Sequence, residues 1–136
     1  MNVAVFRPDD DRLADAVSLL ESLGVTPVGD PMLAIEPTGA VPRDDSAFTV
    51  LTSKTGVEIA AEAAWSPADA TVCAIGEGTA RALRDCGYRV DLIPEEFSSA
   101  GLVRTLDGRV DGERVEVARS DHGSAVLTDG LEASGA

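Results

Sequence analysis

Lysine is almost absent from this chain of 136 residues: Lys54 is the only one among 11 basic residues, whereas 24 residues are acidic. The formal net charge at pH 7 is −13. Nucleic acids and anionic membranes would repel such a surface, so neither is expected as a partner. A surface with many carboxylates and hardly any lysine suits a protein at high salt, where screening weakens the repulsion between like charges. The composition therefore predicts a halophilic source.

Cysteine, histidine and aromatic residues are also scarce. Cys73 and Cys86 are the only cysteines and His122 is the only histidine, and their spacing matches neither a redox pair nor a metal site. We therefore expect no bound metal, two cysteines that act as small core residues, and a solvated or capping histidine. Aromatic residues make up 4% of the chain and apolar residues 44%, so the core must consist mainly of Val, Leu, Ile and Ala.

Long hydrophobic runs are missing as well. No apolar segment approaches the length of a membrane span, and the first residues lack the basic and apolar pattern of a secretory signal. The mean hydropathy of +0.05 is that of a chain that folds. We expect no membrane association and a cytoplasmic location.

Strands alternate with helices from residue 47 onward. Short apolar strands are expected at 48–51, 71–75, 89–93 and 114–118, and the helices that follow them at 55–64, 78–86, near 98–106 and near 123–133. Such alternation is typical of parallel strands joined by right-handed helical crossovers. The sequence therefore predicts an α/β fold in which helices cover both faces of a parallel sheet.

The first 36 residues form a smaller pattern of their own. A short strand ends before Arg7, a helix begins at the acidic run 9–11 and ends at Gly24, and extended segments follow. One βαβ piece is too small to bury its helix by itself. The segment 37–46 is rich in Pro, Gly and Asp, which is typical of a linker. We expect 1–36 to be part of an incomplete first lobe, 37–46 the linker, and 47–136 a second lobe without its closing strand.

Small residues and hydroxyls gather where the predicted strands end. Ligands of parallel α/β sheets bind beyond these ends, where the first amides of each following helix attract anions. The sequence therefore predicts an anion-binding cleft, with no catalytic residue assigned. In the other interpretation the hydroxyls only cap their helices. The candidate binding residues are Arg7, Thr52, Ser53, Lys54, Gly76, Glu77, Thr79, Arg119 and Ser120.

The pair Gly76 and Gly78 invites comparison with a dinucleotide-binding loop. That loop needs a third glycine, and Arg81 occupies its place here. No Gly-Lys-Ser/Thr sequence follows, so the turn is not a phosphate-binding P-loop either. A nucleotide is therefore the less favoured anion.

Four segments, in order, resemble the uroporphyrinogen-III synthase family. They are "VAVFRP", "FTVLTSKTGVEI", "CAIGEGTARALRDCGYRVDLIPEEFSSAGLVRTL" and "RVEVARSDHGSAVLTDGL". Each motif is short, and the ordered set, which spans nearly the whole chain, carries the resemblance. It implies two α/β lobes, the second of them flavodoxin-like, joined by a two-stranded linker.

The resemblance also implies a reaction in tetrapyrrole biosynthesis, on the route to porphyrins and heme. The linear tetrapyrrole hydroxymethylbilane closes into a ring with inversion of its last pyrrole and loss of water, and no cofactor is required. On this basis Arg7, Lys54 and Arg119 would bind substrate carboxylates. Thr79 matches the family's threonine in the Ile-Gly-x-x-Thr turn and is the foremost candidate.

One departure from the family bears on activity. Family members continue past the last helix into a closing strand, which carries a tyrosine thought to assist the leaving hydroxyl. Tyr88 belongs to a different strand and does not inherit that role. We therefore expect a truncated chain, monomeric or paired with a missing C-terminal segment, and the sequence leaves open whether it is active alone. The alternatives are a non-catalytic α/β module for a small anion or nucleotide, and a fragment that folds only with a partner.

Overall fold

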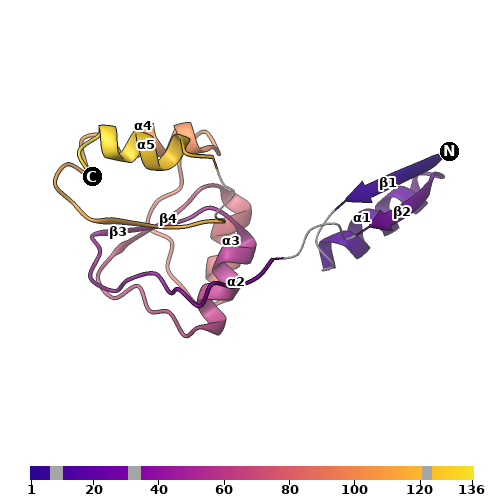
Figure 1. Cartoon of the computed structure of the whole chain (residues 1–136), viewed down its shortest axis with the longest axis horizontal. Coiled ribbons are helices and arrows are strands. Elements are labelled where there is room, and N and C mark those ends of the chain that lie inside the picture. The colour runs from indigo at the N-terminus through magenta and orange to yellow at the C-terminus, as the bar shows by residue number, and fades with distance from the viewer. Residues whose placement is uncertain (7–10, 31–34, 121–123) are drawn as a thin grey trace. The chain divides into compact units, whose positions relative to one another are not determined.

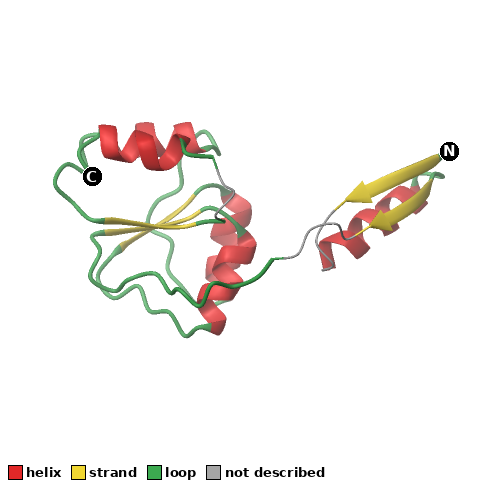
Figure 2. Ribbon diagram, in the orientation of Figure 1, coloured by secondary structure: helices red, strands yellow, loops and turns green. Residues whose placement is uncertain are grey.

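The computed structural model describes residues 1–6, 11–30, 35–120 and 124–136. Strands and helices alternate along the chain, and all the strand pairs are parallel, so the predicted α/β class is confirmed (Figure 1 and Figure 2). The chain divides into two compact units, Met1–Thr38 and Gly39–Ala136. No described helix is long and apolar enough to cross a membrane.

The first unit is a two-stranded parallel sheet with one helix. Strands β1 (Asn2–Phe6) and β2 (Thr26–Asp30) pair side by side, and α1 (Asp11–Ser22) connects them. Each strand is an edge, so Pro27 costs the sheet no interior hydrogen bond. Leu13 is the one buried apolar residue described here, while Phe6 is 58% exposed. Other large apolar side chains of this unit are also exposed: Leu19, Leu23, Val28 and Ile35.

The second unit is built on a three-stranded parallel sheet. Strands β3 (Phe48–Leu51), β4 (Thr71–Ala74) and β5 (Val115–Ala118) lie in the order β4-β3-β5. Phe48 lies opposite Thr71 on one side and Val115 on the other. Since β3 has a neighbour on each side and helices above and below, all its residues are buried.

The predicted strand at 89–93 is wrong in extent, because only a single bridge between Cys73 and Leu92 forms beside β4. The Asp91 carboxylate accepts the hydrogen bond of the Val72 amide at 2.8 Å, so a side chain takes the place of a backbone carbonyl. Pro94 follows at once and has no amide to continue the ladder.

Helices cover both faces of the second sheet, as Figure 1 shows. Helices α2 (Lys54–Glu62) and α3 (Glu77–Asp85) pack on one face, and α4 (Ser99–Leu106) and α5 (Val126–Ala133) on the other. Neighbouring residues of β3 point to opposite faces: Val50 contacts the α4–α5 cluster and Leu51 the α2–α3 cluster. All four predicted helices are present, with ends moved by a few residues.

The two cysteines differ in environment. Cys73 is buried in the sheet, as expected, but Cys86 is exposed, so its prediction as a core residue is wrong. Cys86 is the C-cap of α3, where the helix ends at the surface and Gly87 turns the chain with a φ of +85°. Burial raises the pKa of the Cys73 thiol to about 12.

Candidate functional site

The order of the strands brings the carboxyl ends of β3 and β5 together. β4 lies on one side of β3, and β5, the strand that follows β4 along the chain, lies on the other side. The strand order therefore reverses at β3. Here the Thr52 hydroxyl donates a hydrogen bond to the Ala118 carbonyl at 3.2 Å, and the Thr52 amide donates to the same oxygen at 3.4 Å. Such a switch point is where parallel α/β sheets bind their ligands.

The end of β4 adjoins this point. The Ile75 amide donates to the Leu51 carbonyl at 3.1 Å, which fixes the turn that begins α3 beside the end of β3. Gly76 is the N-cap of α3 and provides no capping side chain. The first amides of α3 are therefore left for an outside acceptor, which favours an anion. The turns after β3, β4 and β5 thus lie along one edge of the sheet.

Phe97 lies beside this edge and is not among the residues predicted from the sequence. A Cβ atom at Gly76 would lie 3.1 Å from the Phe97 Cβ and 3.2 Å from its Cγ. The φ of Gly76 is −166°, which any residue can adopt, so the close approach of Phe97 is what favours glycine here. Phe97 is 62% exposed although it is aromatic. An aromatic residue just before the N-cap Ser98 was the signal available in the sequence.

Several candidate side chains already have structural partners. The Ser53 hydroxyl caps α2 by accepting from the Gly56 amide at 3.0 Å, as the capping interpretation predicted. The Lys54 ammonium lies 3.6 Å from the Glu58 carboxylate, one turn along the same helix. The Glu77 carboxylate accepts from Arg84 at 2.9 Å. These side chains are engaged along their helices, so their backbone amides are better candidates for a ligand than their charges.

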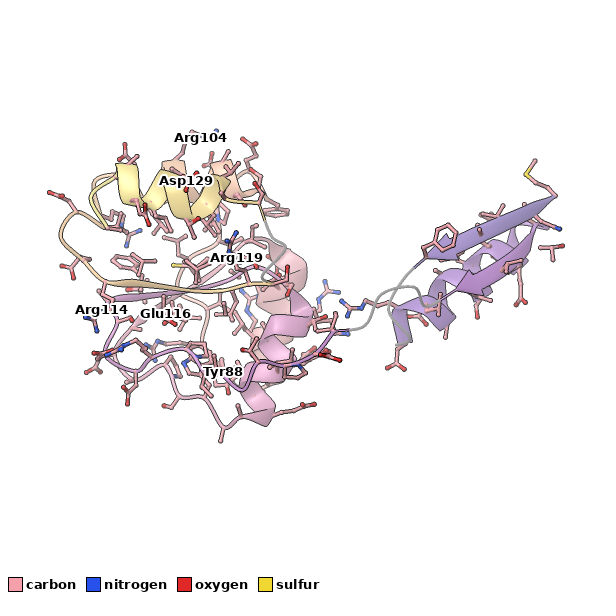
Figure 3. The ribbon with its side chains drawn as sticks, viewed as in Figure 1. Tyr88, Arg104, Arg114, Glu116, Arg119 and Asp129 are labelled. Carbon is pink, nitrogen blue, oxygen red and sulfur yellow. The ribbon has the colours of Figure 1, made fainter. Side chains whose placement is uncertain are left out.

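Thr79 and Arg119 have fewer competing contacts. Thr79 lies in the first turn of α3, is only 7% exposed, and takes no part in the side-chain hydrogen bonds among the described residues. The Arg119 guanidinium donates to the Ser124 carbonyl at 2.5 Å and, within the described part of the chain, contacts no carboxylate (Figure 3). Ser120 is exposed beside it. Arg7 lies outside the described residues, as does His122.

Charges near the candidate edge are balanced in pairs. Glu96 accepts from the Ser98 hydroxyl at 3.1 Å and from the Arg104 guanidinium, and both interactions lower the pKa of its carboxyl. The Glu77–Arg84 and Lys54–Glu58 pairs are further examples. Among the described residues these three carboxylates are thus paired with basic groups, and Arg119 can attract an anion.

Tyr88 lies away from the candidate edge. Its ring packs on Trp65 with centroids 4.9 Å apart, and its hydroxyl donates to the Trp65 carbonyl at 2.8 Å. Burial raises the pKa of this phenol. Because the hydroxyl is bonded to the Trp65 carbonyl, the structure offers no reason to give Tyr88 a role toward a ligand.

The candidate edge lies within the second unit. Two hollows described in this unit lie elsewhere: one of about 510 Å³ between β5 and α5, and one of about 400 Å³ beside Trp65 and Tyr88. No group of three or more His, Cys, Asp or Glu that could hold a metal occurs among the residues placed by the structure. The arrangement can bind anionic groups through amides, hydroxyls and one guanidinium, and it contains no evident acid–base pair.

Comparisons with known proteins agree on one family. Residues 14–136 match the family model described as uroporphyrinogen-III synthase HemD. A curated protein of Methanothermobacter thermautotrophicus, provisionally assigned as a uroporphyrinogen-III synthase, is 33% identical over 147 aligned positions. That alignment includes 98% of this chain and 58% of the relative.

Solved structures show the same fold. The uroporphyrinogen III synthase of Thermus thermophilus superposes with a TM-score of 0.57 at 24% identity, over 98% of this chain and 57% of that protein. A mutant of the same enzyme superposes with a TM-score of 0.67 at 21% identity, over 98% and 58% of the two chains. The chain thus spans less than three fifths of the length of these relatives.

Proposed function

The chain belongs to the HemD uroporphyrinogen-III synthase family, and we propose that it takes part in closing hydroxymethylbilane into uroporphyrinogen III. In this reaction the hydroxymethyl group loses its hydroxyl as water, and the carbon that remains forms a bond to the substituted carbon of the last pyrrole, which becomes inverted. The adjoining pyrrole nitrogen stabilises the cationic intermediate. The protein's main task is therefore to hold the linear substrate in a folded conformation.

The observation that carries the proposal is the meeting of three strand ends at one edge of the sheet. Thr52 is bonded to Ala118, and Ile75 is bonded to Leu51. Through these contacts the first amides of α3 and Arg119 lie along one edge, and Thr79, which is buried, belongs to the first turn of α3. A substrate that carries several carboxylates suits such a set, because amides and a guanidinium bind carboxylates without chemical reaction.

From this arrangement we assign different roles to the candidate residues. We assign the carboxylate contacts to Arg119 and to the amides at 76–79, and a hydroxyl contact to Thr79. Thr52 and Ser53 hold the turn in place, while Ser120, Lys54 and Glu77 belong to its margin. Arg7, which lies outside the described residues, stays a predicted carboxylate ligand. The activity needs no cofactor in this proposal. Tetrapyrrole biosynthesis for heme and related pigments, in a cytoplasm of high salt, is the setting that fits the acidic composition.

The direct test is conversion of freshly prepared hydroxymethylbilane, followed by chromatographic separation of the oxidised type I and type III rings. The type I ring forms without enzyme, so the measured quantity is the type III fraction above that background. The assay compares this chain alone with the chain mixed with a polypeptide that carries the part of the Methanothermobacter relative it does not match. Type III product that forms only when this chain is present, either alone or with the second polypeptide, supports the proposal.

A pair of arginine variants locates the activity. Arg119→Gln removes the guanidinium at the candidate edge, whereas Arg109→Gln removes one that lies 5.9 Å from the ring of Phe48, at the start of β3. We expect only the first to lower the type III fraction, with thermal unfolding of both variants used to check folding. Binding of uroporphyrinogen without conversion would favour a non-catalytic anion-binding module. If the chain shows no binding and no conversion, both alone and with the second polypeptide added, the proposal is overturned.

A further inference from the structure

Large apolar side chains are exposed at few places in the second unit. Among its described residues they are Val41, Phe97 and Val126. Val41 lies in the segment before β3, whereas Phe97 comes two residues before α4 and Val126 is the first residue of α5. Single exposed apolar residues are common, but two that lie beside a candidate binding edge deserve a physical reason.

Phe97 lies beside the first turn of α3. A Cβ atom at Gly76, the N-cap of that helix, would be 3.1 Å from the Phe97 Cβ. The amides that follow Gly76 are those assigned above to a substrate carboxylate. Phe97 is 62% exposed, so its side chain is largely uncovered. An anion-binding turn and an exposed aromatic ring are therefore neighbours.

The turn that carries Phe97 is held on both sides. The Ser98 amide donates to the Glu96 carbonyl at 2.8 Å, across Phe97. The Ser98 hydroxyl caps α4 by accepting from the Gly101 amide at 3.0 Å. The Glu96 carboxylate accepts from the Ser98 hydroxyl and from Arg104. Because the turn is fixed before any ligand arrives, the ring loses little conformational entropy when it is covered.

Val126 has a similar relation to Arg119. The Arg119 guanidinium donates to the Ser124 carbonyl at 2.5 Å, and the Ser124 hydroxyl accepts from the Val126 amide at 3.2 Å. Ser124 thus connects the guanidinium to the start of α5. Val126 is 52% exposed. The second anion-binding group of the edge therefore also has an exposed apolar side chain close to it.

The two apolar side chains lie at the same end of the sheet. Phe97 lies against the turn after β4, and Val126 follows the turn after β5. Helices α4 and α5 pack together where Gly130 meets Val103, about one turn after each helix begins. The starts of the two helices are therefore near each other.

We propose that Phe97 and Val126 are ring-contact residues, against which two pyrrole rings of the tetrapyrrole pack while carboxylates of the same rings bind the α3 amides and Arg119. This inference rests on the proposed function and names the parts of the site that bind rings rather than charges. The substrate's carboxylates are attached to its pyrroles, so each bound charge brings an apolar ring with it. An apolar side chain beside each anion-binding group covers that ring and removes it from water.

A series of variants at position 97 separates contact with a ring from packing within the protein. Phe97→Leu keeps the Cβ and Cγ atoms that lie against Gly76 but loses the aromatic face, whereas Phe97→Tyr keeps that face. The measured quantity is the Kd of uroporphyrinogen III, by calorimetry without oxygen, for the full chain alone and with the second polypeptide. We expect the Kd to rise on the order of tenfold for Phe97→Leu and to stay near the wild-type value for Phe97→Tyr.

Val126→Ala tests the second contact. We expect it to raise the Kd roughly threefold, because two methyl groups are removed from a side chain that the ring would cover. Leu19→Ala is the matched control: Leu19 is 62% exposed, as Phe97 is, but it lies on α1 in the first unit, and its loss should leave the Kd unchanged. Thermal unfolding of every variant checks that the fold is intact.

The possible failures can be told apart. If the wild-type chain binds or converts tetrapyrrole while Phe97→Leu and Val126→Ala match it, the ring contacts are overturned and the proposed function stands. If Phe97→Tyr weakens binding as much as Phe97→Leu does, the aromatic face is not what the ligand contacts, and the inference is again overturned. If the wild-type chain neither binds nor converts tetrapyrrole, alone or with the second polypeptide, the proposed function fails and the ring contacts fail with it.

Discussion

The Thr52 hydroxyl donates to the Ala118 carbonyl at 3.2 Å and so joins the ends of two strands that are 66 residues apart in the chain. The Thr52 amide shares the same acceptor at 3.4 Å. Through this carbonyl, the ends of β3 and β5 are hydrogen-bonded to each other at the candidate edge. The position of Arg119, the next residue, depends on it.

Replacing Thr52 by valine should loosen this edge. The variant loses one hydrogen bond, worth about 0.5–1.5 kcal/mol of unfolding free energy, while the Thr52 amide keeps the carbonyl partly satisfied. If the edge binds substrate, the rate of type III ring formation should fall roughly tenfold, as expected for a comparable loss in the transition state. Thr105→Val is the control, because it also removes one hydroxyl bond, to Gly101 within α4. Equal effects of both variants on the rate would contradict a special role of this edge.

The contact between α4 and α5 predicts a clear glycine effect. A Cβ atom at Gly130 would lie 2.6 Å from one methyl carbon of Val103 and 2.9 Å from the other. We expect Gly130→Ala to lower the free energy of unfolding by about 1–3 kcal/mol. Gly78→Ala is the control: no atom lies within 4 Å, so the helix should gain about 0.5–1 kcal/mol. Urea unfolding followed by the fluorescence of Trp65 measures both, and equal stabilities would show that the two helices separate easily.

Asp45 should make stability depend on pH in the acidic range. Its carboxylate accepts from Arg43 at 2.7 Å and from Arg114 at 2.8 Å, and these interactions, the Arg43 hydrogen bond foremost, hold its pKa well below the usual range. Because the folded pKa is depressed, the stabilisation is present above the unfolded pKa of about 3.9 and is lost as the pH falls below it.

The matching variant is Asp45→Asn, which should be less stable than wild type at neutral pH and should lose less stability on acidification. Thermal unfolding from pH 7 to pH 2 tests this, with Asp69→Asn as a control at an exposed position. High salt should shrink the difference between Asp45→Asn and wild type, because screening weakens exposed ion pairs. Parallel pH profiles of Asp45→Asn and wild type would contradict the assigned contacts.

The two thiols should react at very different rates. Cys86 is exposed, whereas Cys73 is buried and its pKa is raised to about 12, so hardly any thiolate is present at neutral pH. We expect an aromatic disulfide reagent to modify Cys86 rapidly in the folded chain and Cys73 only on unfolding. Cys86→Ala should therefore abolish the fast phase and keep the slow one. A fast phase that survives this substitution would show that the sheet opens readily.

Apolar periodicity predicted the second sheet well, because β3 and β4 are buried on both faces and their sequences are almost continuously apolar. It failed at 89–93, where the Asp91 side chain replaces a backbone acceptor, a contact that no propensity records. It also could not tell a capping hydroxyl from a binding one. Ser53 proved to be a cap, whereas Thr79 has no such bond among the described residues. Phe97 was missed because its contact with Gly76 depends on how two turns meet in space.

β3 lies between two strands that follow it in the chain, and this has a consequence during synthesis. It leaves the ribosome first among the three strands, but its partner Val115 is made only after all of α2, β4, α3 and α4. Until then a strand destined for complete burial exposes one flank of unsatisfied backbone and apolar side chains. Nascent chains stalled just short of β5 should be the species that chaperones retain and that aggregates first.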